Sequence, residues 1–145
     1  MITDTEPVRG RFFVELELSN DADLIRADVG LISPEKVRRL TIRGVVDSAA
    51  PRLVIPQSVA QELGLEISGI AKVRYADGHA AERSIARRIR LKLNGRESIF
   101  SAIVEPARES VLIGAIVMED LDFLIDCTGQ RLVLRDPNQI ISEAE

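Results

Sequence analysis

Short apolar or alternating runs, separated by turn-forming residues, recur along most of this 145-residue chain. Alternation of apolar and polar residues is typical of β-strands, because successive side chains point to opposite faces of a sheet. We predict strands over residues 11–18, 37–46, 53–55, 71–75, 85–93, 99–104, 122–125 and 131–134. Short strands at such regular spacing, accompanied by one or two short helices, predict an all-β barrel or sandwich.

The connections between these runs carry their own signals. We expect turns at residues 19–21, 33–36, 77–78 and 94–95. The last two are Asp-Gly and Asn-Gly pairs, which are the strongest short-range signals of a hairpin. The two short helices are expected at residues 57–63 and 115–121. The length of the chain favours a single domain. Because only 3% of its residues are aromatic, we expect the hydrophobic core to consist of Val, Ile, Leu and Ala.

The charge balance limits the classes of partner. The net charge is -4, which argues against a general nucleic-acid-binding surface. A local exception is the basic segment from Arg83 to Arg96, in which basic and apolar residues alternate over 88–93. We interpret it as a half-buried strand with a solvated basic face. A phosphate-binding stripe, or a nucleic-acid adaptor that uses residues 87–92, is the alternative.

Cysteine and histidine are too scarce for several kinds of site. Cys127 is the single cysteine and His79 the single histidine, so neither a disulfide framework nor a Cys- or His-ligated metal site is expected. We therefore predict no metal and no cofactor, and we expect His79 to be an exposed loop residue. No signal-peptide pattern and no long apolar run is present, which predicts a soluble cytoplasmic protein without a membrane partner.

The segment around Asp47 carries the clearest chemical signal. Val45 and Val46 lead directly into this aspartate, and three small residues follow, Ser48, Ala49 and Ala50. A carboxylate at the end of a buried strand is costly unless it is hydrogen-bonded or protonated. Small neighbours let backbone N–H groups approach the carboxylate and leave room for a ligand, as a poised acid or base requires. The alternative is an ordinary turn opened by an Asp side chain.

Taken in order, several segments resemble the retropepsin-like aspartic proteases of clan AA, in particular their small bacterial members. The matching segments are Val46-Asp47-Ser48-Ala49-Ala50 with Ile55-Pro56, then Leu63-Gly64-Leu65, Tyr75-Ala76-Asp77-Gly78, Leu112-Ile113-Gly114 and residues 121–126 with 131–133. The resemblance covers residues 10–137 and leaves 1–9 and 138–145 as terminal tails. One residue departs from the family pattern, since Ala49 stands where the family has glycine.

The resemblance implies a closed acid-protease barrel with one lobe per chain. It implies that Asp47 is the catalytic residue, in the active-site turn of Ser48, Ala49 and Ala50, and that the hairpin at Ala76, Asp77 and Gly78 is the substrate-binding flap. An aspartic protease needs two carboxylates that share one proton. Asp126 precedes a Cys and is interpreted as a strand-to-turn junction, so the second carboxylate is expected from Asp47 of another copy.

The function that follows is an aspartic endopeptidase, active as a homodimer on peptide or protein substrates. The alternative is a dimeric module of the same fold that binds peptides or proteins without cleaving them, because a fold by itself does not specify a function.

Overall fold

A computed structural model describes residues 11–140 and residue 144. Its strands are β1 (Arg11–Asn20), β2 (Arg39–Asp47), β3 (Val54–Pro56), β4 (Glu66–Arg74), β5 (Ala80–Leu93), β6 (Arg96–Glu105), β7 (Val111–Ile113), β8 (Phe123–Asp126) and β9 (Arg131–Leu134). Its helices are α1 (Asp21–Asp28), the 3-10 turn η1 (Pro34–Lys36), α2 (Gln57–Glu62) and α3 (Ala115–Leu121).

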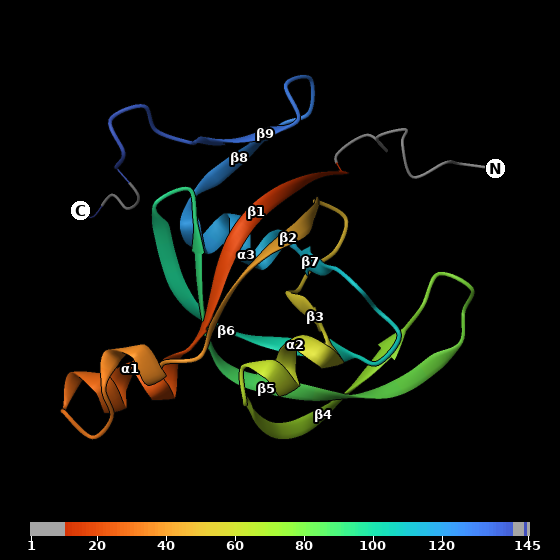
Figure 1. Cartoon of the computed structure of the whole chain (residues 1–145). Helices are drawn as coiled ribbons and strands as arrows, with labels where there is room; N and C mark the ends of the chain where they lie inside the picture. Colours follow the sequence, from red (N-terminus) through yellow and green to blue (C-terminus); the bar gives the residue numbers. More distant parts are fainter. Residues whose placement is uncertain (1–10, 141–143, 145) are drawn as a thin grey trace.

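Six of the strands form a closed ring. They are hydrogen-bonded in the order β1-β2-β7-β3-β6-β5, and β5 pairs again with β1. Strand β4 lies outside the ring and pairs with β5, so the two form the long hairpin that leaves the barrel in Figure 1. The predicted all-β, closed, single-lobe barrel is confirmed.

The core is mostly aliphatic, as expected from the composition, although Phe12, Phe100, Phe123 and Met118 are also buried in it. Leu18, Leu53, Ile55, Leu63, Ile89, Leu91, Leu93, Ile113, Val46, Val111 and Val117 are among the fully buried side chains. In β5 the apolar residues of the alternating segment 88–93 are buried and the basic ones reach the surface, which confirms the predicted half-buried strand. Burial of each such aliphatic side chain stabilises the fold by about 1.5–3 kcal/mol before entropy is counted.

The structure contains a helix that we did not predict. We expected only a turn at residues 19–21, but β1 continues to Asn20 and α1 begins at Asp21. The Asn20 side chain accepts a hydrogen bond from the Asp23 N–H at 3.1 Å. Asn is favoured both in turns and at helix N-caps, and the polar composition of α1 hides its helical period. Helices α2 and α3 lie where we predicted them.

The hairpin β4–β5 is longer than predicted. We expected strands at 71–75 and 85–93, whereas β4 begins at Glu66 and β5 at Ala80. Most residues of β4 are exposed, and so are several at the start of β5. A strand exposed on both faces shows no alternation of hydrophobicity. The strands predicted from alternation are therefore shorter than the observed ones.

Strands β8 and β9 form a separate antiparallel hairpin beyond α3. Asp126 ends β8, and its Oδ1 accepts the Gly129 N–H at 2.9 Å while its Oδ2 lies 3.1 Å from Arg131 Nε. These contacts, the Gly129 hydrogen bond first, lower the pKa of the Asp126 carboxyl. The predicted role of Asp126 as a strand-to-turn junction is confirmed. None of the helices in the described part of the chain is long and apolar enough to cross a membrane.

Candidate active site

Asp47 is the last residue of β2 and lies between two neighbouring strands. On one side β1 pairs antiparallel with β2 and places Arg11 opposite Asp47. On the other side β7 runs parallel to β2, with Val46 opposite Ile113. The Asp47 side chain is only 17% exposed. The barrel therefore holds this carboxylate, largely shielded from solvent, at the end of a half-buried strand.

Two different groups contact the two oxygens of the Asp47 carboxylate. Oδ1 accepts a hydrogen bond from the Ala49 N–H at 3.0 Å. Oδ2 lies 3.3 Å from Nε of Arg11, although this Nε is buried without a well-aligned hydrogen bond among the described residues. The backbone approach expected from the small residues is present at Ala49, whereas the arginine neighbour was not predicted.

The turn after Asp47 is held against the start of α3 by a close backbone crossing. The Ala115 N–H donates to the carbonyl of Ala50 at 2.7 Å, and the Ile116 N–H donates to that of Pro51 at 3.1 Å. A Cβ on Gly114 would lie 2.3 Å from the Arg52 carbonyl oxygen. Only a residue without a side chain fits at 114, and this contact fixes the position of the turn that carries Asp47.

A second arginine, Arg108, belongs to the electrostatic surroundings of Asp47. Its Nε donates to the Ser110 carbonyl at 2.6 Å. Burial and the charge of Arg11 lower the pKa of Arg108, while the negative charges of Glu105 and Asp47 act in the opposite direction. Sequence reasoning missed both arginines. Arg11 becomes a neighbour only through the register of β1 and β2, and no local pattern marks Arg108.

The predicted flap is a hairpin tip between β4 and β5. The Tyr75 N–H donates to the His79 carbonyl at 2.9 Å, and the Gly78 N–H donates to the Tyr75 carbonyl at 2.9 Å. Gly78 has a φ of +91°, which glycine adopts at low cost. The predicted hairpin turn is confirmed, and His79 is exposed as expected. No hydrogen bond or ion pair among the described residues connects this tip to Asp47.

His79 organises the tip through two neighbours. Its ring stacks on Tyr75 with centroids 4.6 Å apart, and its Nδ1 contacts Oδ1 of Asp77. This hydrogen bond lowers the pKa of the Asp77 carboxyl. The tip is thus a defined turn and not an open loop.

The base of the flap is connected to the barrel by a polar cluster that we did not predict. Tyr75 donates its hydroxyl hydrogen bond to Oε2 of Glu105, and Arg83 Nε donates to Oε1 of Glu105 at 2.7 Å. Burial, followed by the Glu105 hydrogen bond, raises the pKa of Tyr75. Glu105 is the last residue of β6, so this cluster ties the flap to a strand of the ring.

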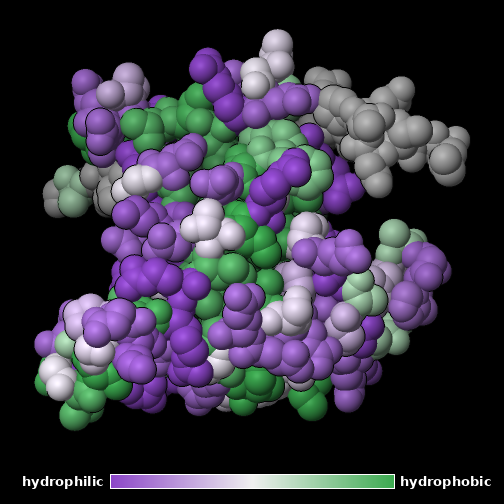
Figure 2. Space-filling view, viewed as in Figure 1, coloured by the Kyte–Doolittle hydropathy of each residue, from purple (hydrophilic) through white to green (hydrophobic). Residues whose placement is uncertain are grey.

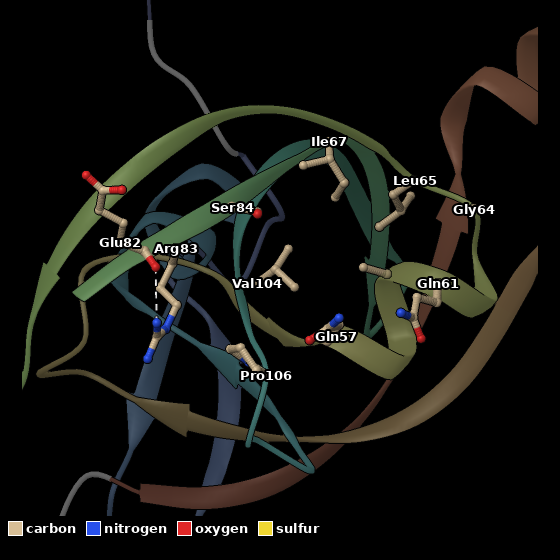
Figure 3. Close-up of a pocket in the computed structure, with 11 residues that line it drawn as sticks. Gln57, Gln61, Gly64, Leu65, Ile67, Glu82, Arg83, Ser84, Val104 and Pro106 are labelled. Carbon is tan, nitrogen blue, oxygen red and sulfur yellow. Dashed lines mark hydrogen bonds between the residues drawn. The ribbon is translucent and has the colours of Figure 1, made fainter.

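A cavity of about 410 Å³ lies between α2 and the flap hairpin. Figure 3 shows Gln57 and Gln61 of α2 on one side of it, and Arg83 and Ser84 of β5 on another. Neither Asp47 nor the flap tip is among its lining residues. The described residues contain no group of three or more His, Cys, Asp or Glu side chains that could hold a metal ion.

Comparison with known proteins identifies the fold. No family model and no curated protein matches this chain. Among solved structures, it is similar to the EIAV protease complexed with the inhibitor HBY-793, with a TM-score of 0.53 and 14% sequence identity. The match covers 92% of this chain and 100% of that one. At this identity the likeness shows a retropepsin-like fold and nothing about activity, which has to be inferred from the chemistry of the site.

Proposed function

We propose that this chain is an aspartic endopeptidase that acts as a homodimer, with Asp47 of each copy as its catalytic pair. The observation that carries the proposal is the position of Asp47. It ends a barrel strand, accepts the Ala49 N–H at 3.0 Å, and lies on a turn locked by the backbone crossing at Gly114. On a barrel with the retropepsin-like fold, this is a carboxylate presented from a rigid support.

The chemistry needs two such carboxylates and one proton between them. Two carboxylates about 3 Å apart cannot both be ionised, so the pair holds one negative charge and one proton. The charged member takes a proton from a water molecule, whose oxygen attacks the peptide carbonyl carbon. The protonated member donates to the carbonyl oxygen, and a proton then passes to the leaving nitrogen as the C–N bond breaks.

The second carboxylate has to come from a second copy. The other candidate aspartate, Asp126, accepts hydrogen bonds from the Gly129 N–H and from Arg131 Nε within its own turn. A two-fold axis next to Asp47 would bring the same residue from both copies together. Ser48 is exposed beside it and would hydrogen-bond across that axis.

The flap would then close over a bound peptide. A tip of Ala76, Asp77 and Gly78 at the end of a long hairpin can move as a lid and exclude water from the reaction. The cluster of Tyr75, Arg83 and Glu105 gives this lid a fixed base.

A second function is favoured by one specific contact. Arg11 Nε lies 3.3 Å from Oδ2 of Asp47, on the oxygen that is not taken by the Ala49 N–H. A guanidinium there competes with a second carboxylate for Asp47. Together with the methyl group of Ala49, it favours a dimeric module that binds peptides at the same site without hydrolysing them.

The deciding experiment incubates the full chain with a diverse peptide mixture and identifies products by mass spectrometry. We expect cleavage by the wild type and none by Asp47→Asn, which keeps the shape of the side chain but cannot share the proton. Asp28→Asn, at an exposed position at the end of α1, is the matched control and should cleave normally. Equal rates for wild type and Asp47→Asn would exclude Asp47 as the catalyst, and saturable peptide binding without products would establish the binding module.

A further inference from the structure

Four arginines converge on a second cavity at the opposite end of β2 from Asp47. This arginine cavity has a volume of about 440 Å³, and its lining includes Asn20, Arg26, Arg38, Glu66, Arg87 and Arg88. Strand β2 spans nine residues from Arg39 to Asp47, so the two sites are separated by about 26 Å along the strand. Figure 2 shows strongly hydrophilic side chains gathered beside α1 on this face of the molecule.

A buried carboxylate holds one half of the arginine cavity in place. Asp23 is 4% exposed, and its two oxygens accept from Arg38 Nε at 2.8 Å and from Arg38 Nη2 at 3.0 Å. The Arg38 backbone N–H donates to the same carboxylate at 3.0 Å, and Arg26 Nη1 lies 3.2 Å from it. The guanidinium groups of Arg26 and Arg38 are therefore oriented before any ligand arrives.

The other half depends on an irregularity in β5. In a regular strand two consecutive side chains point to opposite faces. The pairing of β5 with β6 shifts register between Ala86 and Ile89, and Arg88 has a φ of +57°. A left-handed non-glycine residue in a bulge re-aims its side chain at a cost in backbone free energy. As a result, Arg87 and Arg88 both line the same cavity.

The charges in the arginine cavity do not balance. Four positively charged guanidinium groups line it, but only two carboxylates are close enough to offset them. These are Glu66, which also lines the cavity, and Asp23, which lies behind Arg38. Glu66 pairs with Arg88, and Asp23 with Arg26 and Arg38. Arg87 donates to the Ser68 carbonyl at 3.2 Å, and no carboxylate within the described residues pairs with it. Two positive charges are left over.

We propose that the arginine cavity binds a small ligand that carries phosphate groups. Guanidinium groups match the geometry and charge of phosphate oxygens through paired N–H donors. The cavity volume falls in the range typical of small-molecule sites, and the surplus charge suits an anion with two or more negative charges. The site is independent of the chemistry proposed for Asp47.

Isothermal titration calorimetry of the full chain with pyrophosphate, at constant ionic strength set with sodium chloride, tests the proposal. We expect saturable one-site binding to the wild type, and roughly 10- to 100-fold weaker binding to Arg87→Gln, because one charged hydrogen-bonding group is lost. Arg26→Gln should weaken binding in the same way. Arg43→Gln is the matched control, since Arg43 lies over the Phe13 ring outside the cavity, and its affinity should stay within about 2-fold of the wild type.

Far-UV circular dichroism of each variant shows that it is folded before titration. Arg87 is exposed, so its replacement leaves the core intact. Absence of pyrophosphate binding at millimolar concentration, or equal affinities for wild type, Arg87→Gln and Arg43→Gln, would overturn the proposal. Titration with succinate separates phosphate from carboxylate recognition, because equally tight binding of both would refute the assignment to phosphate.

Discussion

The backbone crossing at Gly114 makes a quantitative prediction about stability. In Gly114→Ala the new Cβ would lie 2.3 Å from the Arg52 carbonyl oxygen and 2.7 Å from both the Ala50 carbonyl oxygen and the Arg52 nitrogen. Carbon and oxygen atoms without a bond between them approach to about 3.3 Å. The turn and the start of α3 must therefore separate by about 1 Å, and all three opposing atoms belong to the backbone, which cannot rotate away.

The expected cost combines overpacking with lost hydrogen bonds. Overpacking of a tight site costs about 1–3 kcal/mol. The two hydrogen bonds that cross this contact, from the N–H groups of Ala115 and Ile116, contribute about 0.5–1.5 kcal/mol each. We expect Gly114→Ala to lower the free energy of unfolding by about 4 kcal/mol and the melting temperature by roughly 10 °C for a chain of this size.

Gly44→Ala is the matched control for this measurement. Gly44 also lies on extended backbone, in β2, but its Cβ would meet only side-chain atoms, Ile113 Cδ1 and Leu16 Cδ2 at 2.9 Å and Ile113 Cγ1 at 3.2 Å. These side chains can shift within the core, whereas backbone atoms at 114 cannot, and no hydrogen bond is lost, so we expect a smaller loss of about 1–2 kcal/mol from overpacking alone. Thermal denaturation followed by circular dichroism compares the two variants. A melting temperature of Gly114→Ala within about 2 °C of the wild type, or an equal loss in Gly44→Ala, would refute the reasoning.

Three further predictions concern pH and the active-site turn. Hydrogen bonds from Arg38 lower the pKa of Asp23 from 3.8 to about 2, so the charged carboxylate contributes about 2 kcal/mol of stability above pH 4. This contribution is lost as the pH falls from about 4 to about 2, and urea unfolding should show the difference between wild type and Asp23→Asn shrinking over that range. Ala49→Gly should keep or raise peptidase activity, because glycine lets the backbone approach Asp47 more closely, and a large loss without unfolding would contradict this. Peptidase activity should follow a bell-shaped pH profile with an acidic optimum, since the pair needs one shared proton, and activity that rises steadily past pH 8 would rule out the mechanism.

Local sequence patterns were sufficient to predict most strands of the barrel and to single out Asp47. The alternation around Ile89 and Leu91 marks one buried face, because a strand buries every second side chain wherever it lies in a sheet. The boundaries of α3 and the hairpin turn at Gly78 follow from equally local preferences. The run of small residues after Asp47 likewise predicts a backbone N–H donor near its carboxylate, and Ala49 supplies one.

The features that decide the chemistry of the sites depend on contacts between distant residues. Arg11 lies next to Asp47 only because β1 and β2 pair in one particular register, and a shift by one residue would turn its side chain to the other face. Arg87 and Arg88 share a cavity with Arg26 and Arg38 only because β5 contains a bulge. Pairing register and bulges depend on how whole strands pack, and the local sequence of one strand does not encode its partner. The sequence by itself therefore determined the type of fold and the position of the carboxylate, and only the tertiary structure decided which charges surround it.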